Sequence, residues 1–505
     1  MSLTRRHFLQ AGGASALLAS VGCDRLPEAM KSLLAPDRAS VDGPFRPPTS
    51  DEIDPVSHFL NRLTFGPRPG DHQRVRALHA DADQSAALFL EQQLAPEKID
   101  DAFAAYSVRR LETLVEPLGE LFEYKEKVLL DELIRATLLR AINSDRQLYE
   151  VMVHFWSDHF NIDPSKGDAK WLKVADDRDV IRTHALGKFS DLLKASAFSP
   201  AMLWYLDGRV NRRSKDSDKP NENYGRELLE LHTLGVHGGY SQKDVMEAAR
   251  CLTGWTVRAT EQSRFDIGKV EFNPRQHDKG RKTLLGHEFP AWPEGLSADE
   301  QQERGRGEVV RLLQLTADHP ATAQHIATKL CRRFIADEPP KAAVDSVADA
   351  FSRTGGEIRS TLRALFATAA FRETRGGKFK RPFHFIVSAL RATGAETDAG
   401  QPVVDFLLRM GHAPFHYPTP DGYPEEASPW MGTLLWRWNF AVALAEGRVG
   451  GTKIQANKLA KAFGGDAGLI AHLLGRKPTA TETSAYHESG AGLALMLAAP
   501  SFQRC

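Results

Sequence analysis

The sequence predicts a mainly α-helical protein with a small β-hairpin insertion around residues 255–289. Apolar residues recur at helical spacing through most of the chain, which indicates amphipathic helices. The interval 255–289 instead holds short strand-like pieces around turn residues. Ser241 and Asp244 form a capping-box pattern at the start of one helix. The predicted helices cover residues 120–143, 148–160, 181–195, 226–234, 243–252, 322–334, 342–354 and 383–395.

The first 23 residues are predicted to be a secretion signal. Arg5 and Arg6 stand just before a small and apolar segment, residues 11–21, that carries no charge. The arginine pair resembles the signals of the twin-arginine pathway, which exports proteins already folded. The apolar segment is shorter than the roughly 20 residues of a membrane-spanning helix. We therefore expect a periplasmic protein; the alternative is a basic N-terminus that is retained.

The end of this signal resembles a lipobox, in which Cys23 is diacylated and becomes the new N-terminus. Ser20 stands where a lipobox usually has leucine. Lipidation of Cys23 would give a membrane tether, and Asp24 resembles the signal that retains lipoproteins in the inner membrane. A plain cut near this point would instead release a soluble periplasmic protein. Residues 24–55 follow as a Pro-rich tether.

Residues 56–505 are predicted to form one large helical domain, with a sub-boundary near residues 290–300. The remaining cysteines, Cys251, Cys331 and Cys505, are widely spread and form no C-x-x-C motif, so no zinc or haem motif is present. Cys251 and Cys331 lie in helical apolar patterns, and we predict that both are buried thiols.

The charge balance argues against two classes of partner. The chain has 65 basic and 65 acidic residues, so its formal net charge is zero. This gives no electrostatic reason to expect nucleic acid or an anionic membrane surface as a partner. No G-x-S-x-G, P-loop, Rossmann or H-E-x-x-H motif is present, which disfavours the common hydrolase, nucleotide-binding and zinc-protease classes.

The densest polar segment, residues 221–235, carries the candidate catalytic residues Arg226, Glu227 and Glu230. At about 100° per residue these three lie on one helix face, and leucines point elsewhere. Arg226 is four residues from both Glu222 and Glu230, so one interpretation is a solvated face stabilised by ion pairs. The functional interpretation places this face in a cleft, where burial raises carboxyl pKa values for acid–base chemistry.

His159 and His277 are the histidines that complete the candidate site. His154 and His159 lie about 140° apart on a helix and cannot share one face. We interpret His154 as a histidine packed among aromatic residues and His159, beside Asp158, as a polar participant. His277 lies on a predicted turn and would contribute only if folding brought it to the other candidates. A metal-dependent variant would use as ligands Glu227, Glu230, His159 and His277, although no spacing requires it.

Several segments together resemble a known bacterial family. They are residues 58–66, 155–156, 159–160, 222–235, 239–245, 252–255, 277–278, 380–383, 410–415, 420–424 and 501–503, with Lys282 and Gly286. They resemble the exported family catalogued as domain of unknown function 1800 over nearly the whole mature chain. The resemblance implies no activity. It implies export and a partner from a second exported family, domain of unknown function 1501. It also leads us to expect phenylalanine at His232 and asparagine at Asp158.

Two hypotheses about function follow. The first is an envelope enzyme, a hydrolase or lyase, with Glu227 or Glu230 as acid or base, Arg226 orienting an anionic group, and His159 or His277 assisting. The second is a non-catalytic binding or assembly protein for an exported partner, with the charged helix as internal scaffold. Changing Glu227 to glutamine would abolish activity in the first case and destabilise the fold in the second.

Overall fold

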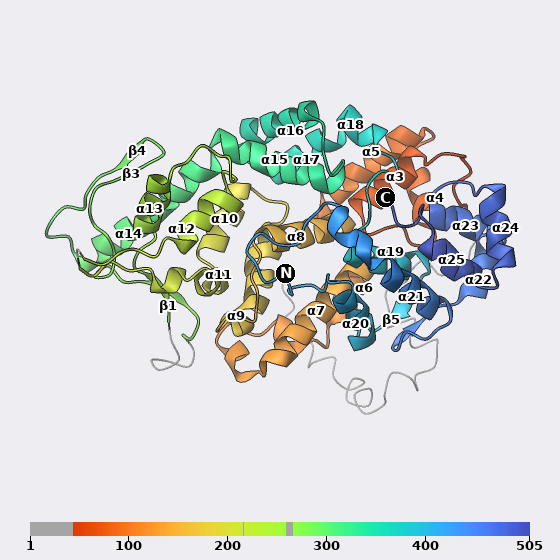
Figure 1. Cartoon of the computed structure of the whole chain (residues 1–505), viewed down its shortest axis with the longest axis horizontal. Helices are drawn as coiled ribbons and strands as arrows, with labels where there is room; N and C mark the ends of the chain where they lie inside the picture. The colour runs from red at the N-terminus through yellow and green to blue at the C-terminus, as the bar shows by residue number, and fades with distance from the viewer. Residues whose placement is uncertain (1–43, 216, 259–265) are drawn as a thin grey trace, which may run out of the picture.

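The computed structural model describes residues 44–215, 217–258 and 266–505. In this part the chain is mainly α-helical, as predicted (Figure 1). The predicted signal peptide, Cys23 and residues 24–43 of the tether lie outside the described residues. No described helix is long and apolar enough to cross a membrane.

The elements follow the chain from one half to the other. The first half forms α3 (Pro55–Leu63), α4 (Asp71–Arg76), α5 (Ala82–Gln93), η2 (Pro96–Lys98), α6 (Ala102–Val108), η3 (Glu112–Leu114), η4 (Glu120–Glu123), α7 (Glu126–Asn143), α8 (Gln147–His159), α9 (Ala169–Ala175), η5 (Asp176–Arg182), α10 (Phe189–Ala197), α11 (Pro200–Tyr205), η6 (Gly208–Val210), α12 (Asn223–Glu227), η7 (Leu228–His232) and α13 (Gln242–Cys251). The second half forms α14 (Ala298–Ala317), α15 (Pro320–Phe334), α16 (Lys341–Arg353), α17 (Ile358–Phe366), α18 (Ala369–Glu373), α19 (Pro382–Ala392), α20 (Gln401–Arg409), η8 (Ser428–Thr433), α21 (Leu434–Ala445), α22 (Ala456–Ala462), α23 (Asp466–Leu474), α24 (Ala480–Glu488) and α25 (Gly492–Ala498).

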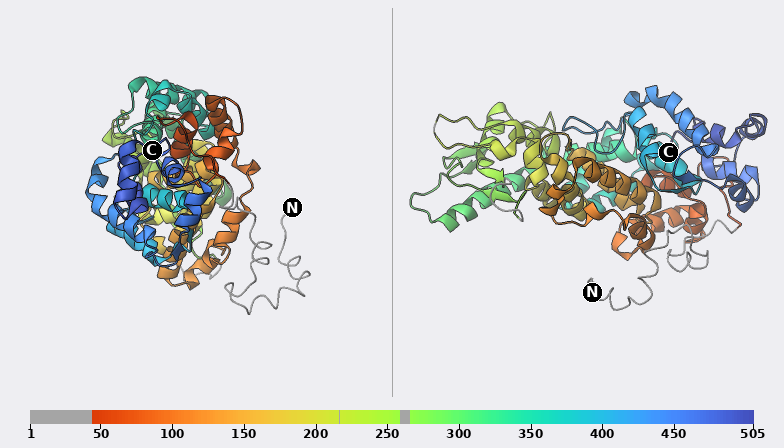
Figure 2. Two further views of the ribbon diagram at one scale, coloured as in Figure 1. Left: turned by 90° about the vertical axis from the view of Figure 1, so that its right-hand side faces the viewer. Right: turned by 90° about the horizontal axis from the view of Figure 1, so that it is seen from below.

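The helices form an elongated body with α8 near its middle (Figures 1 and 2). The C-terminal helices α22 to α25 lie at one end, and α13, α14 and the hairpins lie at the other. Most residues of α8 are buried, because α8 packs against α3, α5, α7 and η5. The centre of the molecule is therefore the place where a polar residue on α8 needs a specific partner.

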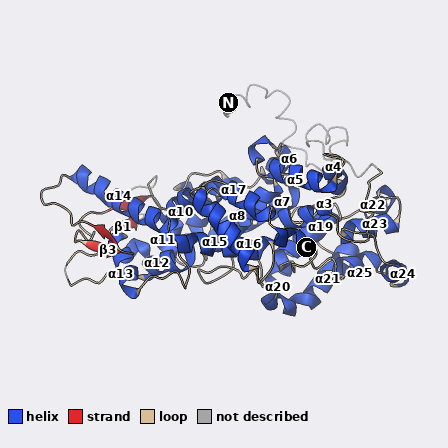
Figure 3. Ribbon diagram, turned by 90° about the horizontal axis from the view of Figure 1, so that it is seen from above, coloured by secondary structure: helices blue, strands red, loops and turns tan. Residues whose placement is uncertain are grey.

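The predicted β insertion is confirmed. Strand β1 (Trp255–Val257) pairs antiparallel with β2 (Val270–Phe272), and β3 (Lys282–Leu284) pairs with β4 (His287–Phe289). Both hairpins lie at one end of the molecule (Figure 3). A third pair, β5 (Glu396–Thr397) with β6 (Thr452–Lys453), was not predicted, because strands of two residues leave no alternation to detect.

Two predicted helices are interrupted in the structure. The predicted helix 181–195 is broken, because Gly187 and Phe189 form backbone hydrogen bonds with residues 356–358 and a new helix, α10, begins only at Phe189. The predicted helix 120–143 begins as the single turn η4 before α7. Both differences arise from contacts distant in sequence, which local periodicity does not contain.

The predicted helix 226–234 begins earlier, at Asn223, and continues from α12 into the π-helical turn η7. A Cβ at Gly225 would lie 2.9 Å from Val245 O and from Ala249 N, so glycine is required for α12 to approach α13 this closely. Helix α13 begins with the capping box of Ser241 and Asp244, as predicted.

One contiguous cluster of buried apolar residues extends from Val56 to Phe502 and includes Cys251 and Cys331. Both cysteines are free and buried, which confirms the prediction. Buried arginines connect distant parts of the chain through backbone carbonyls: Arg391 donates to Gly66 O (2.6 Å) and Arg437 donates to Lys380 O (2.8 Å). Their charges are compensated by fixed carbonyl dipoles in the core.

Candidate functional site

Glu227 and Glu230, the predicted acid–base pair, are both half-buried where α12 passes into η7. The pKa of Glu227 is raised, first by burial and then by the neighbouring charges of Glu230 and Asp421, although Arg226 opposes the shift. The two glutamates therefore lie in one acidic neighbourhood, as the helical spacing predicts. Asp421 joins them from a distant loop that the sequence did not connect with this helix.

Arg226 is oriented away from the role that we predicted. Its Nη2 donates to Glu222 Oε1 at 2.5 Å, and its Nη1 donates to Gln242 Oε1 at 3.3 Å. Both Arg226 and Glu222 are about one-third exposed. This is the i,i+4 pair of a solvated helix face, which stabilises a helix by only a few tenths of a kcal/mol.

His159 is buried and reaches the 222–235 segment through the backbone. Its Nε2 donates to His232 O at 3.1 Å, and its ring lies 6.2 Å from the rings of His232 and His325. Burial, followed by the charge of Lys329, holds the pKa of His159 well below its usual value. His159 is therefore a neutral donor that fixes the end of η7.

His277 lies in a separate buried network. Its Nδ1 donates to Thr253 O at 2.8 Å, and its Nε2 lies 3.6 Å from Glu308 Oε1. Glu308 is also paired with Lys282 (2.6 Å) and accepts a hydrogen bond from Trp292. No described contact joins His277 to Glu227, Glu230 or His159. The five predicted site residues do not form one site in the described structure.

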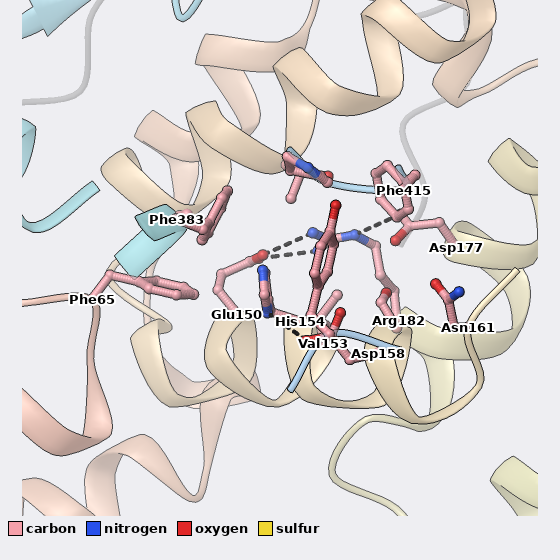
Figure 4. A pocket seen from close by; sticks show the side chains of 15 residues that line it. Phe65, Glu150, Val153, His154, Asp158, Asn161, Asp177, Arg182, Phe383 and Phe415 are labelled. Atoms are coloured by element: carbon pink, nitrogen blue, oxygen red, sulfur yellow. Dashed lines mark hydrogen bonds and ion pairs between the residues drawn. The ribbon is translucent and has the colours of Figure 1, made fainter. Parts of the chain in front are cut away.

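The structure places a different group of residues around a small cavity beside α8 (Figure 4). His154, Ser157 and Asp158 occupy one face of the helix, and Asn161 follows one turn later. The facing wall is aromatic and consists of Phe65, Phe383, Phe415 and Tyr423. A row of polar side chains thus meets an apolar wall, the composition that is typical of ligand and active sites.

Asp158 is the carboxylate of this cavity. Its Oδ2 accepts from Arg381 Nη1 at 2.8 Å and lies 3.6 Å from His154 Nδ1. No described residue donates to Oδ1. Burial raises the pKa of Asp158 to about 6, although Arg381 opposes this shift. Asp158 therefore changes its charge close to neutral pH and keeps one oxygen available.

Arg381 fixes the state of His154. Its Nη2 donates to His154 Nδ1 at 3.2 Å, so the neutral ring carries its proton on Nε2. Burial, and then the charge of Arg381, hold the pKa of His154 well below its usual value. Packing against Phe383, with ring centroids 4.5 Å apart, agrees with the prediction of an aromatic environment.

Behind Asp158 lies a layer of charged residues. Arg381 also pairs with Glu425 (3.2 Å), and Arg333 lies 3.6 Å from the same carboxylate. The amine of Lys329 has no hydrogen bond or ion pair among the described residues. Burial lowers the pKa of Lys329 to about 8, although Asp158, Glu425 and Asp421 oppose this shift. Lys329 is the unpaired cation of the neighbourhood.

The far side of the cavity carries a closed ion-pair network (Figure 4). Arg182 donates to both oxygens of Glu150, at 3.0 and 2.7 Å, and to Asp177 at 3.0 Å. Burial opposes the charge of Arg182, but the two carboxylates outweigh it and raise its pKa. This network satisfies its own charges and forms a structural wall of the cavity.

The loop of residues 412–425 lies directly on the end of α8. Asn161 Nδ2 donates to Tyr417 O (2.9 Å) and Thr419 O (2.7 Å). Gly422 has φ +73°, and a Cβ there would overlap the carbonyl oxygen of Asp158. Glycine at this position therefore lets the loop bring Asp421, Tyr423 and Glu425 to α8.

Comparison with known proteins gives one match. The family described as "Protein of unknown function (DUF1800)" matches residues 58–504. The chain belongs to this family. No curated protein and no solved structure matches it.

The segments by which the sequence resembles the DUF1800 family meet around Asp158. Residues 155–160 belong to α8, residues 380–383 begin α19 with Arg381, and residues 410–424 form the loop on α8. The 222–235 segment joins them through the bond from His159 to His232 O. Segments far apart in the sequence therefore converge on one place in the fold.

The ligand atoms of His154, Asp158 and His412 lie within 4.8 Å of one another, a spacing that a metal ion could bridge. The hydrogen bonds disfavour this. His412 Nδ1 accepts from Phe383 N–H (3.1 Å) and His154 Nδ1 accepts from Arg381, so each neutral ring carries its proton on the other nitrogen. Arg381 also places a positive charge on Asp158. The group is suited to hydrogen bonding and proton transfer.

The sequence contained a signal for this site that our reasoning did not use. His154 and Asp158 are four residues apart, and Ser157 is three from His154, so all three share one face of α8. We compared His154 only with His159, which lies on another face. The contributions of Arg381, Lys329 and the 412–425 loop have no local signal, because they come from segments more than 150 residues away.

Proposed function

We propose that the protein is an exported hydrolase in which Asp158 acts as the general base. The observation that supports this is a carboxyl group with a pKa of about 6 and an unbonded Oδ1 in a cavity beside His154 and Ser157. A base whose pKa lies near the working pH combines a large ionised fraction with sufficient proton affinity.

The size of the cavity favours hydrolysis over elimination. The volume open to the centre of a water molecule is about 20 Å³, which admits a water molecule but not a substrate. Asp158, Ser157 and Asn161 offer polar partners for such a water. We propose that Asp158 takes a proton from this water as the water oxygen attacks the substrate.

The substrate would approach through the open groove formed by α7, α9 and α20. Its volume is about 1540 Å³, and Phe415 lines both the groove and the cavity. Phe415 has φ +63°, a strained conformation for a bulky residue and one that is common at functional sites. Movement of this side chain would connect the water to a substrate in the groove.

Lys329 is the acid that we propose for the leaving group. It is the unpaired cation near Asp158, and its pKa of about 8 leaves the amine protonated at neutral pH and able to release its proton. The expected pH–rate profile is a bell whose limbs reflect Asp158 on the acidic side and Lys329 on the basic side.

The test is hydrolysis of purified envelope polymers, measured as release of new end groups. We expect Asp158→Asn and Asp158→Ala to lose at least a hundredfold in rate with unchanged melting temperatures. Asp349→Asn, at an exposed aspartate, is the matched control and should keep full activity. Full activity of Asp158→Asn would exclude a general base at this position, because an amide cannot accept the proton.

The alternative function is a non-catalytic assembly protein. It is favoured by the pairing of Arg381 and Arg333 with Glu425 and Asp158, which is the arrangement of an internal scaffold. In that case Asp158→Asn would lower the melting temperature, and no polymer would be cleaved. A partner from the domain of unknown function 1501 family, which the resemblance implies, would then co-purify with the wild-type chain.

We further propose that the protein reaches the periplasm through the twin-arginine pathway and is tethered through Cys23. Replacing Arg5 and Arg6 with lysine should retain the chain in the cytoplasm, as cell fractionation would show. A Cys23→Ser variant should leave the membrane fraction. Export of the lysine variant, or unchanged fractionation of the serine variant, would contradict these assignments.

A further inference from the structure

A helix face in the C-terminal part of the chain exposes four large apolar side chains. Met431, Leu434, Leu435 and Trp438 are 51, 47, 65 and 41% exposed. Their spacing is i, i+3, i+4, i+7, so they lie along one side of η8 and α21. We call these four residues the α21 apolar face. Singly exposed apolar residues are common, but a contiguous row at helical spacing indicates a contact surface.

The opposite side of α21 is held firmly in the core. Arg437 is buried and donates to Lys380 O (2.8 Å) and Gln503 Oε1 (2.9 Å), and Phe440 and Leu444 are buried in the apolar cluster. Helix α21 also packs closely against α25. The α21 apolar face is therefore presented outward by a fixed helix and cannot turn inward.

The chain that leads to Cys23 leaves the described structure at the same end of the molecule. Phe45 N–H donates to Ala462 O at 2.7 Å, and the Phe45 ring lies 5.1 Å from that of Phe463, just after α22. Helices α21 to α25 pack together at this end (Figure 1). Residues 24–43, when extended, span at most about 70 Å. A membrane that holds Cys23 is thus within reach of the α21 apolar face.

We propose that the α21 apolar face lies on the lipid surface to which the N-terminus is tethered. Tryptophan, leucine and methionine on one side of a helix are the side chains that enter the boundary between headgroups and acyl chains. Four such residues give weak binding alone, and weak insertion together with a lipid anchor gives stable attachment. The face then fixes which side of the body the membrane meets. This inference is independent of the proposed hydrolase activity.

The charge of the chain defines the kind of lipid surface. The formal net charge is zero, so no electrostatic attraction to anionic lipid is expected. Binding through the α21 apolar face should therefore occur on zwitterionic vesicles and should be insensitive to salt. Strong salt dependence, or binding only to anionic vesicles, would assign the attachment to another surface.

The experiment uses the chain from residue 24, without lipid, and vesicles of zwitterionic phosphatidylcholine in a co-sedimentation assay. We expect the chain with its native face to bind, and Leu435→Glu and Trp438→Glu to lower the partition coefficient at least tenfold. Val115→Glu and Val236→Glu are matched controls, because these residues are 79 and 60% exposed on other elements. The controls should bind like the chain with the native face, and all variants should keep its melting temperature.

Two results would overturn the proposal. The first is no binding of the chain with the native face, or an equal loss in the Val115→Glu control. The second is a dimer in sedimentation velocity that Leu435→Glu dissociates while vesicle binding is absent, which would assign the face to a second copy of the chain.

Discussion

Replacing Gly422 with alanine should detach the loop of residues 412–425 from α8. At this position the backbone has φ +73°, and a Cβ would overlap Asp158 O and lie 2.8 Å from its carbonyl carbon. Both obstacles are backbone atoms of a buried helix and cannot move aside. The loop must therefore rise, and with it the residues that it brings to Asp158.

The magnitude follows from two contributions. A non-glycine residue in the left-handed region costs about 1–2 kcal/mol. Lifting the loop also breaks the bonds from Asn161 to Tyr417 O and Thr419 O and the bond from Tyr205 to Pro418 O, at about 1 kcal/mol each. We expect Gly422→Ala to lower the free energy of unfolding by about 4–5 kcal/mol.

Gly411 is the matched control within the same region. Its φ is +69°, but no heavy atom lies within 4 Å of the position of its Cβ. Gly411→Ala should therefore lose only the conformational part, about 1–2 kcal/mol. Urea unfolding followed by circular dichroism measures both variants. Equal destabilisation of the two variants would refute the close contact between the loop and Asp158.

The remaining predictions concern charged groups. Burial raises the pKa of Asp158 from 3.8 to about 6, so ionisation penalises the native state and stability is lost as the pH rises from about 4 to about 6; Asp158→Asn should remove this loss, up to about 3 kcal/mol, in urea unfolding across this range. The pKa of Lys329 is lowered from 10.5 to about 8, so the native state is penalised while the amine is protonated; Lys329→Met should gain about 1–2 kcal/mol at pH 7, and this gain should vanish as the pH rises from 8 to above 10. A loss of stability at pH 7 would instead identify Lys329 as part of a scaffold. Arg182→Met leaves two buried carboxylates unpaired and should lower the free energy of unfolding by about 3–5 kcal/mol, with partial recovery when Glu150→Gln is added; additivity of the two changes would contradict the network. Glu227→Gln removes a half-buried carboxyl with a raised pKa and should change stability by less than about 0.5 kcal/mol; a larger loss in thermal unfolding would support the scaffold interpretation.

Local patterns in the sequence predicted the class of the fold and much of its detail. The helices α8, α13, α15 and α16 begin and end within two residues of their predicted limits, because amphipathic periodicity and caps act over single turns. The break at Gly187 could not be predicted in this way. It arises from backbone bonds to residues 356–358, about 170 positions away.

The candidate site was predicted only in part. Glu227 and Glu230 do share a half-buried acidic neighbourhood, because their spacing on one helix fixes their relation. His277 was placed with them by analogy of residue type, whereas the fold packs it against Glu308 and Trp292. Proximity between segments is decided by tertiary packing, which residue type does not encode.

By itself the sequence determined the helical class, the hairpin insertion, the buried thiols and membership of the DUF1800 family. These properties follow from periodicity, turns and motifs, each contained within a short stretch of chain. Only the tertiary structure decided that Arg381, Lys329 and the 412–425 loop meet α8 at Asp158. The pKa of that carboxyl is a property of its burial and of charges from distant segments, so it comes into existence only when the chain has folded.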